Sequence, residues 1–400
     1  MHPAVEELIG IMSGLLPSIN LPYHLHEPTL DKTDEDAVVS CIREKYVSSV
    51  GSWVNKFESE LAHIFQARHA VCVFNGTVAL HALLHTLGIG RDDEVLCPAL
   101  TFVGTANAIS HSGATPHFVD CNAETLGVDA DALRLYLNSI AIYRNGKLIN
   151  KNTQRRIAAL VVVHVLGHAA DVDALQTVTD EYGLLLIEDA AEALGTLYKG
   201  KPVGARGKAG MVSFNGNKVI TTGSGGALLT NDDHLAQHFR YVTSTAKLTH
   251  PWGFYHTEVG FNYRMPSLNA ALGLSQLKKL PYLLEKKRNL AAIYAQAFNH
   301  SDYWGFIAEP SFSTSNYWLN AIKLKTPMRE IVESGLEQLS QQQFYCRPLW
   351  TAMHHLPMYI HCPRGPLPIT ESLEQQVINL PSSPDLLNVI IKANEHYACH

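Results

Sequence analysis

The sequence lacks the features that mark several classes of protein. No apolar run reaches about 18 residues, so we expect no membrane-spanning helix. The first residues, MHPAVEELIGIMSGLLPSI, carry no basic segment, and we therefore expect no signal peptide. The net charge is −6 without a long block of like charge, which argues against non-specific nucleic-acid binding. We also find no internal repeat and no low-complexity segment.

Paired cysteines and metal-binding motifs are also lacking. The seven cysteines are an odd number without C-x-x-C spacing, and Cys72, Cys97 and Cys121 lie in apolar runs. We therefore expect buried free thiols and a reducing compartment, the cytoplasm. The 21 histidines are scattered. His164 and His168 have the spacing of a helical metal pair, but VVVHVLGHAAD resembles a strand running into a glycine turn, and we predict no metal site.

What the sequence does contain is a regular alternation of apolar runs and amphipathic helical segments. Its 400 residues, 46% of them hydrophobic, fit a globular enzyme with two domains. Strands that are apolar on both faces predict a mainly parallel sheet covered on both sides, over about residues 60–235. A long helical run follows at 268–299. The predicted strands are 70–75, 93–100, 114–121, 157–166, 184–191, 209–214 and 226–232.

Polar residues stand where several of these strands end, which is where open α/β sheets bind ligands. In VFNGT, Gly76 and Thr77 follow a strand and open a helix. The free N–H groups of a helix N-terminus can bind an anion. The alternative is that these residues form only a cap and turn.

A second group of polar residues ends the apolar strand in LLLIEDAAEALG. It consists of Glu188, Asp189 and Glu192. An acid that follows four aliphatic residues is costly to bury unless a cationic group meets it. The alternative is a helix N-terminal acid that complements the helix dipole.

The segment SFNGNK places Ser213 and Lys218 at a further strand end. A lysine in a neutral, partly desolvated place loses proton affinity and becomes a nucleophile. Alone, Lys218 would be interpreted as a surface lysine in a hairpin turn. Together with an anion site, an acid and the aromatic Phe102, it supplies what pyridoxal 5′-phosphate requires: phosphate contacts, a partner for the ring nitrogen, a flat apolar surface and an amine.

The chain resembles the DegT/DnrJ/EryC1/StrS family of sugar aminotransferases. The matches are NGTVALH, LTFVGTANAI, IEDAAEALG, VSFNGNKVITTGSGGALLTND and VGFNYRMPSLNAALG, in family order over about residues 45–280, and more weakly CRPLW and LPMY. The resemblance implies an α/β structure of aminotransferase fold type I. We expect a large cofactor domain at 1–280, with a mainly parallel mixed sheet flanked by helices, and a smaller α+β domain at 281–400. The first 35 or so residues are candidates to pack on the small domain.

The resemblance also implies roles for the cofactor residues. Lys218 would bear pyridoxal phosphate and move the proton, and Asp189 would pair with the ring nitrogen. Phe102 would stack on the ring, and Glu192 would lie near the ring hydroxyl. The phosphate would be bound by Gly76, Thr77 and Ser213.

A homodimer with shared active sites is expected in addition. The aromatic, charge-poor segment 250–273 is either core or interface by composition, and the resemblance favours an interface. Asn262 would then reach the phosphate in the neighbouring subunit, and His256 or Arg264 could approach the nucleotide.

For the substrate, YVSSVGSWVNKFE and SFNGNKVITTG resemble the branch that acts on UDP-linked 4-keto-6-deoxy-N-acetylhexosamines, on the way to bacillosamine and legionaminic acid. This implies transfer of an amino group from glutamate to C4 of UDP-4-keto-6-deoxy-N-acetylglucosamine. The alternatives are another keto sugar (3-keto, an inosose, or a perosamine-type GDP sugar), a sugar dehydratase, and a non-catalytic sugar-nucleotide-binding regulator. Dehydratase relatives typically replace the lysine by histidine, and Lys218 is present. GKPVGARGKAG lacks P-loop spacing and predicts a solvated hairpin.

Overall fold

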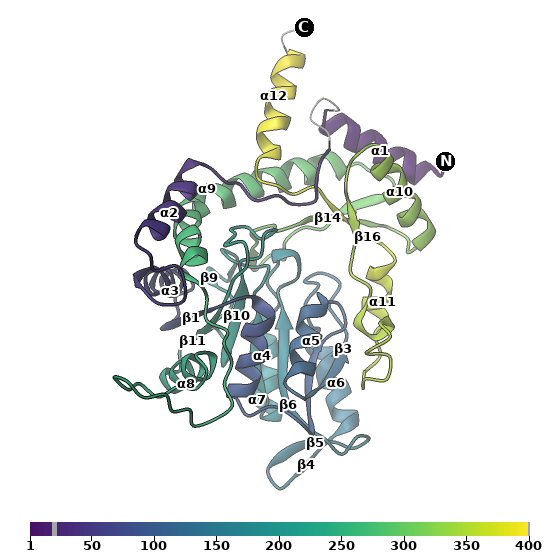
Figure 1. The fold of residues 1–400 in the computed structure, drawn as a ribbon. Coiled ribbons are helices and arrows are strands. Elements are labelled where there is room, and N and C mark those ends of the chain that lie inside the picture. Colours follow the sequence, from purple (N-terminus) through teal and green to yellow (C-terminus); the bar gives the residue numbers. More distant parts are fainter. Residues whose placement is uncertain (18–21, 399–400) are drawn as a thin grey trace.

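The computed structural model describes residues 1–17 and 22–398 (Figure 1). Among them, the largest sheet has nine strands, and its main path runs β1-β11-β10-β7-β6-β2-β3. Along this path β11 alone runs opposite to the other strands. The predicted α/β fold with a mainly parallel mixed sheet is confirmed, and each of the seven predicted strands is present. The strands are β1 (His69–Val73), β2 (Asp93–Pro98), β3 (Thr115–Val119), β4 (Ala141–Arg144), β5 (Lys147–Asn150), β6 (Arg156–Val163), β7 (Leu185–Asp189), β10 (Ala209–Ser213) and β11 (Gly226–Thr230).

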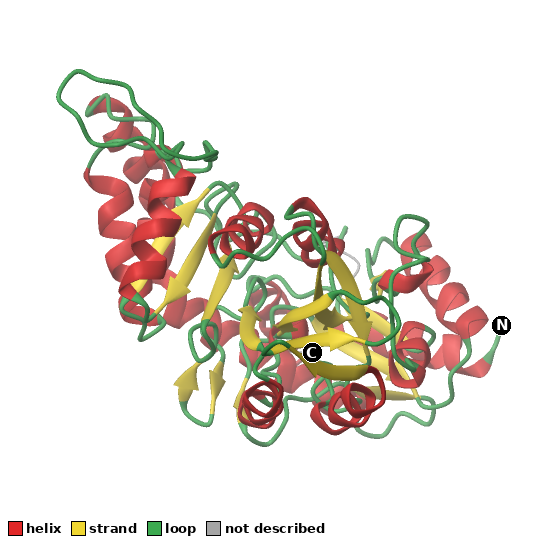
Figure 2. Ribbon diagram, turned by 90° about the horizontal axis from the view of Figure 1, so that it is seen from below, coloured by secondary structure: helices red, strands yellow, loops and turns green. Residues whose placement is uncertain are grey.

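Side chains of the central strands alternate between two hydrophobic cores. In β6, Ala159 and Val161 belong to the core shared with α4, α5 and α8, whereas Leu160 and Val162 belong to the core shared with α6 and α7. A period of two is the signature of a strand that is buried on both faces. Figure 2 shows helices on both sides of the large sheet. These helices are α4 (Gly76–Thr86), α5 (Val103–His111), α6 (Ala130–Ile140), α7 (Val172–Tyr182) and α8 (Asp233–Thr243).

Short polar side chains start most of these helices. Asn75 Oδ1 accepts the Val78 N–H at the start of α4, at 2.9 Å. Aspartates cap α6, α7 and α8 in the same way, which satisfies a backbone donor that has no partner inside the helix. α4 and α5 begin shortly after β1 and β2 end, so their N-termini lie at the same edge of the sheet as the carboxyl ends of those strands, whereas α8 follows the antiparallel β11 and begins at the opposite edge.

One helix passes through both halves of the molecule. α9 (Ser267–Phe298) confirms the predicted long helix and continues through Pro281. Its first part contributes Ala270 and Leu277 to a core with the large sheet, and its second part contributes Leu290 to a core with the smaller sheet. The predicted boundary at 280/281 falls inside this helix, and the division into two domains at that point stays a prediction. Two helices pack along α9: α2 (Lys32–Arg43) and α3 (Ser52–Ile64).

A smaller sheet of the described residues is antiparallel and runs β12-β14-β16-β15. The N-terminal helix α1 packs on this sheet, where Trp304 Nε1 donates to the Ala4 carbonyl at 2.8 Å. The remaining elements are α1 (Pro3–Leu15), η2 (Val165–Gly167), β8 (Leu197–Tyr198), β9 (Lys201–Pro202), β12 (Trp304–Phe306), β13 (Ser313–Thr314), β14 (Asn320–Leu324), α10 (Arg329–Gln341), β15 (Arg347–Pro348), η3 (Met353–His355), α11 (Pro368–Glu374), β16 (Val377–Leu380) and α12 (Leu386–Ala398).

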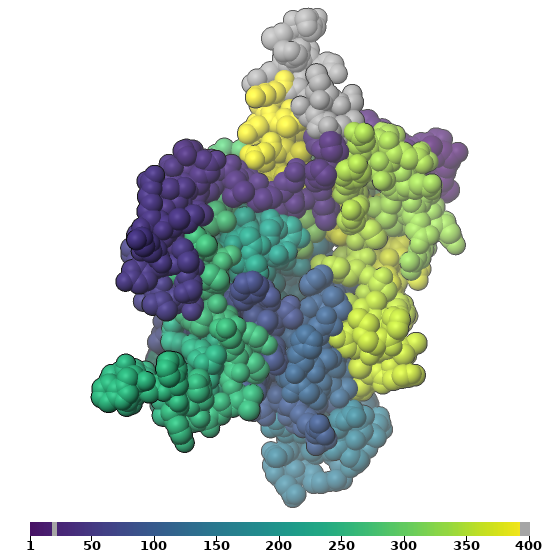
Figure 3. Space-filling model, in the orientation of Figure 1, coloured from purple at the N-terminus to yellow at the C-terminus, as the bar shows by residue number. Residues whose placement is uncertain are grey.

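Two further features of the described chain bear on function. The segment 245–260 protrudes from the body beside α8, as a knob in the space-filling view (Figure 3). It exposes Trp252, Phe254 and Val259, each by about four fifths of its surface. No described helix combines the length and hydropathy needed to cross a membrane. The described cysteines, with Cys72, Cys97 and Cys121 fully buried, carry free thiols.

Candidate active site

A cavity of about 670 Å³ lies at the carboxyl ends of the strands of the large sheet. Strands β1, β2, β6, β7 and β10 end at one wall, and Trp318, Arg347 and Trp350 form the opposite wall. This volume suits a cofactor together with a small-molecule substrate. The cavity is lined by most of the predicted site residues: Gly76, Thr77, Phe102, Asp189, Glu192, Ser213 and Lys218.

Asp189 is buried at the end of β7 and lines the cavity. Its Oδ2 accepts a hydrogen bond from Thr105 Oγ1 at 2.8 Å, and its Oδ1 accepts the Ala191 N–H at 3.1 Å. Burial raises the pKa of this carboxyl group. Turns follow β7, not a helix, so the alternative of a helix N-terminal acid is excluded.

Glu188, one residue earlier, serves a different purpose on the other face of β7. Its carboxylate accepts N–H groups from Gly204, Arg206 and Gly207 and lies 3.1 Å from His164 Nε2. Burial would raise the pKa of Glu188, but these contacts lower it. Glu188 is therefore a satisfied structural acid. The same carboxylate holds the ring of His164.

Lys218 is largely buried beside Glu192 and above Trp318, with 13% of its side chain exposed to the cavity. Its Nζ lies 3.7 Å from Glu192 Oε1 and 3.8 Å from the centroid of the Trp318 ring. Burial lowers the pKa of Lys218, and burial raises the pKa of Glu192 to about 7, although the lysine opposes that shift. Both shifts favour the uncharged forms. Lys218 is therefore a largely enclosed amine whose surroundings favour its neutral form, and it is not a surface lysine in a hairpin.

The end of the cavity at α4 has the geometry of an anion site. Gly76 and Thr77 occupy the first positions of α4, where backbone N–H groups lack helical acceptors. A Cβ added to Gly76 would lie 3.1 Å from Ser213 Cβ, so a larger residue would crowd this cradle. A hydroxyl, free N–H groups and the helix dipole together suit a phosphate.

Phe102 supplies an aromatic surface to the same cavity. Phe102 is 56% exposed although it lines a concave site. Gly104 lets the ring lie close to the backbone, because a Cβ at Gly104 would be 3.0 Å from Phe102 Cδ1. An uncovered ring next to an anion site, an acid and a lysine fits a flat aromatic cofactor that bears a phosphate.

The residues predicted to act across a subunit interface lie outside the cavity of their own chain. Asn262 is exposed and pairs with Ser244 in a β-bridge. His256 is exposed on the protruding segment, with Nδ1 2.8 Å from the Thr245 carbonyl. Arg264 Nη2 donates to Glu58 at 2.7 Å. Their predicted roles in a neighbouring site stay predictions.

Sequence reasoning missed the opposite wall of the cavity. Trp318 is fixed by a hydrogen bond from Nε1 to the Asn217 carbonyl at 2.7 Å. Arg347 on β15 is exposed, and Asn379 stands opposite it on β16. Asn379 Oδ1 is buried without a hydrogen-bond partner among the described residues. The one sequence signal for this wall was the weak match CRPLW.

The fold and the cavity define a class, the pyridoxal phosphate-dependent aminotransferases of fold type I. The sequence profile of the DegT/DnrJ/EryC1/StrS aminotransferase family matches residues 28–392. The chain belongs to this family.

Relatives of known name agree with the family. The chain is 35% identical over 374 residues to the GDP-perosamine synthase of Vibrio cholerae, covering 92% of this chain and 96% of the relative. It is 35% identical over 364 residues to the GDP-perosamine synthase of Escherichia coli O157:H7, covering 91% and 94%. Among solved structures, Helicobacter pylori PseC, an aminotransferase involved in the biosynthesis of pseudoaminic acid, superimposes with a TM-score of 0.83 at 25% identity, covering 94% and 100%.

Proposed function

We propose that the protein transfers an amino group from glutamate to C4 of a nucleotide-linked 4-keto-6-deoxy sugar, and that a GDP-linked, perosamine-type sugar is the favoured substrate. The proposal rests on Lys218, Glu192 and Asp189, which line one cavity at adjoining strand ends. In the net reaction, glutamate becomes 2-oxoglutarate and the C4 ketone becomes an amine.

The strand-end wall would bind the cofactor at three points. Pyridoxal phosphate supplies an aldehyde that takes up amines and a protonated ring that accepts electrons from the adjacent carbon. Asp189, fixed by Thr105 and the Ala191 N–H, would hold the proton on the ring nitrogen. The N–H groups of Gly76 and Thr77 and the Ser213 hydroxyl would bind the phosphate, and Phe102 would cover the ring.

Lys218 would both bear the cofactor and move protons. With the cofactor bound, the lysine Nζ would be the group that takes up and returns protons beside the donor's α-carbon. Trp318 lies under Nζ and confines it to this part of the cavity. Glu192, whose Oε2 is held by the Leu166 N–H at 2.8 Å, would hold its proton near neutral pH and donate it to the ring hydroxyl.

Arg347 would anchor the donor. It is the only arginine among the lining residues, and only Nη1 has a described hydrogen bond, to the Cys346 carbonyl at 3.0 Å. A guanidinium binds a carboxylate through two parallel hydrogen bonds, which suits glutamate. Asn379 on the neighbouring strand would add an amide contact.

The identity of the sugar nucleotide rests on the relatives. Perosamine is a 4-amino-4,6-dideoxy sugar, and two GDP-perosamine synthases cover nine tenths of the chain at 35% identity. They support the GDP-linked alternative better than the UDP-linked N-acetylhexosamine, and than the bacillosamine and legionaminic acid routes that the narrower resemblance favoured. C4 remains the expected position in either case.

A homodimer with shared sites and a cytoplasmic location remain part of the proposal. The exposed aromatic residues of segment 245–260 would be covered by a second copy. That contact would bring Asn262 toward the phosphate in the partner's cavity.

Mass spectrometry of the products tests the substrate. The protein would receive glutamate and, in separate reactions, GDP-4-keto-6-deoxymannose, UDP-4-keto-6-deoxy-N-acetylglucosamine and a 3-keto nucleotide sugar. We expect amination of the GDP sugar with the highest kcat/KM. Preference for the UDP sugar would instead support the UDP-linked N-acetylhexosamine as substrate. Amination of only the 3-keto sugar would overturn the C4 assignment.

A further inference from the structure

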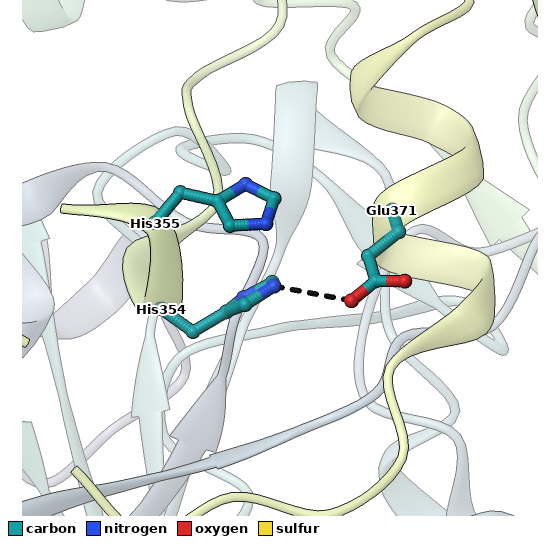
Figure 4. A group of neighbouring side chains, drawn as sticks. All are labelled: His354, His355 and Glu371. Carbon is teal, nitrogen blue, oxygen red and sulfur yellow. Dashed lines mark ion pairs between the residues drawn. The ribbon is translucent and has the colours of Figure 1, made fainter. Parts of the chain in front are cut away.

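Two histidines and a glutamate gather outside the cavity, where η3 (Met353–His355) faces α11 (Pro368–Glu374) (Figure 4). One ligand atom from each of His354, His355 and Glu371 lies within 4.8 Å of the others, and no other such group occurs among the described side chains. His354 Nε2 is 3.3 Å from Glu371 Oε1. Two ligands of a tetrahedral Zn²⁺ with bonds of about 2.0 Å are separated by about the same distance.

His354 is the buried member of the group. Only 4% of its surface is exposed, its Nδ1 has no hydrogen-bond partner among the described residues, and its Nε2 has only the ion-pair contact with Glu371. A buried imidazole with so few polar partners is unfavourable, and a bound ion would supply a further one.

His355 is oriented by a carboxylate on its far side. Its Nδ1 lies 2.9 Å from Glu374 Oε2, and Glu374 Oε1 accepts the Ala352 N–H at 3.2 Å. An Nδ1–H that donates to Glu374 leaves the lone pair on Nε2. In Figure 4, the other ring nitrogen of His355 faces His354 and the Glu371 carboxylate. A carboxylate behind a histidine is the usual support of a metal-binding imidazole.

We propose that His354, His355 and Glu371 bind a divalent transition-metal ion of the Zn²⁺ type, with Glu374 positioning His355. Two imidazoles and one carboxylate suit Zn²⁺ and its neighbours, whereas Mg²⁺ and Ca²⁺ prefer sites built of oxygen. Because Glu371 and His355 are partly exposed, water would fill the fourth position. The ion would link η3 to α11, a few residues after Trp350 and Thr351 in the cavity wall.

The test measures Zn²⁺ binding to the full-length protein loaded with pyridoxal phosphate. After treatment with EDTA and desalting, the protein would be equilibrated with Zn²⁺, and bound metal would be counted by mass spectrometry. A competing chromophoric chelator would give the affinity. His355→Gln and Glu371→Gln change exposed residues, so their folding can be verified by circular dichroism. His361→Gln removes an exposed histidine outside the group and is the matched control.

We expect one Zn²⁺ per chain, with affinity reduced at least a hundredfold by His355→Gln and by Glu371→Gln. Glu374→Gln should reduce it about tenfold, since it removes only the supporting carboxylate. His361→Gln should bind as tightly as the unchanged protein, and Mg²⁺ should not compete. Unchanged affinity in both ligand variants, or an equal loss in His361→Gln, would overturn the site and leave only scattered histidine binding. These outcomes do not depend on the sugar substrate.

Discussion

The two walls of the cavity hold their polar groups in different ways. On the strand-end wall, the carboxylates of Asp189 and Glu192 accept hydrogen bonds from the protein itself. On the opposite wall, Arg347 is exposed and Asn379 Oδ1 has no partner among the described residues. A wall whose groups are already satisfied is preorganised for a resident cofactor. A wall with free polar groups suits ligands that enter and leave in each reaction.

The largest effect is expected at Lys218. Lys218→Ala should abolish transamination, because no other lysine lines the cavity. Formation of 2-oxoglutarate measures this, with Lys201→Ala in the exposed β8–β9 hairpin as the control. Borohydride reduction of the protein with its cofactor, followed by peptide mapping, should label Lys218. A label on a different lysine would disprove the assignment.

Asp189→Asn should come next, with kcat lowered about a hundredfold, or roughly 3 kcal/mol. The amide can still accept a hydrogen bond from Thr105, so the fold should persist, but it cannot stabilise a positive charge on the ring. Steady-state kinetics and a thermal melt separate the two effects. Activity within twofold of the unchanged protein would make Asp189 a structural residue like Glu188.

The opposite wall should show a substrate-specific effect. Arg347→Gln should raise the KM for glutamate about thirtyfold and leave the KM for the sugar nucleotide nearly unchanged, because it removes two charged hydrogen bonds to a carboxylate. Stopped-flow measurement of each half-reaction separates donor from acceptor. A larger effect on the sugar half-reaction would assign Arg347 to the nucleotide phosphates.

Glu192 should make the stability of the cofactor-free protein depend on pH. Its pKa rises from 4.5 to about 7, so the folded protein holds this proton more tightly than the unfolded chain. The stabilising contribution is therefore complete below pH 4.5 and is lost as the pH rises through 7. Between about pH 5 and 7, the free energy of unfolding of the unchanged protein should fall by about 2 kcal/mol more than that of Glu192→Gln. Urea unfolding at each pH measures this difference. Parallel curves for both proteins would contradict the raised pKa.

The smallest effect concerns the neighbouring chain. Asn262→Ala should weaken the affinity for pyridoxal phosphate about tenfold, since one neutral donor to the phosphate is lost. Mixing Lys218→Ala protein with an inactive Asn262→Trp protein should restore activity, because a mixed dimer would contain one site free of both changes. Proven subunit exchange without recovery would mean that each chain builds its own site.

Most of the strand-end wall could be predicted from sequence because it follows local rules. Apolar runs identified the strands, and the residues after four of the runs line the cavity: Gly76, Thr101, Glu192 and Asn215. Sequence could not separate Glu188 from Asp189, because both follow the same run and only the register of β7 decides which one faces the cavity. Sequence did not predict the opposite wall, because tertiary packing of the smaller sheet, not a local pattern, brings its residues to the site. These residues are Trp318, Arg347 and Asn379.

The course of α9 has a mechanical consequence. A helix of 32 residues is about 48 Å long and is buried in one core at its start and in another at its end. A large rotation of the smaller sheet against the larger one would have to bend this rod or expose buried leucines. The helix would bend most easily at Pro281, because proline lacks the backbone N–H of a helical hydrogen bond. Away from Pro281 the helix keeps the two walls at a fixed separation. The width of the cavity is then set by the fold, and it limits the size of the sugars that can enter.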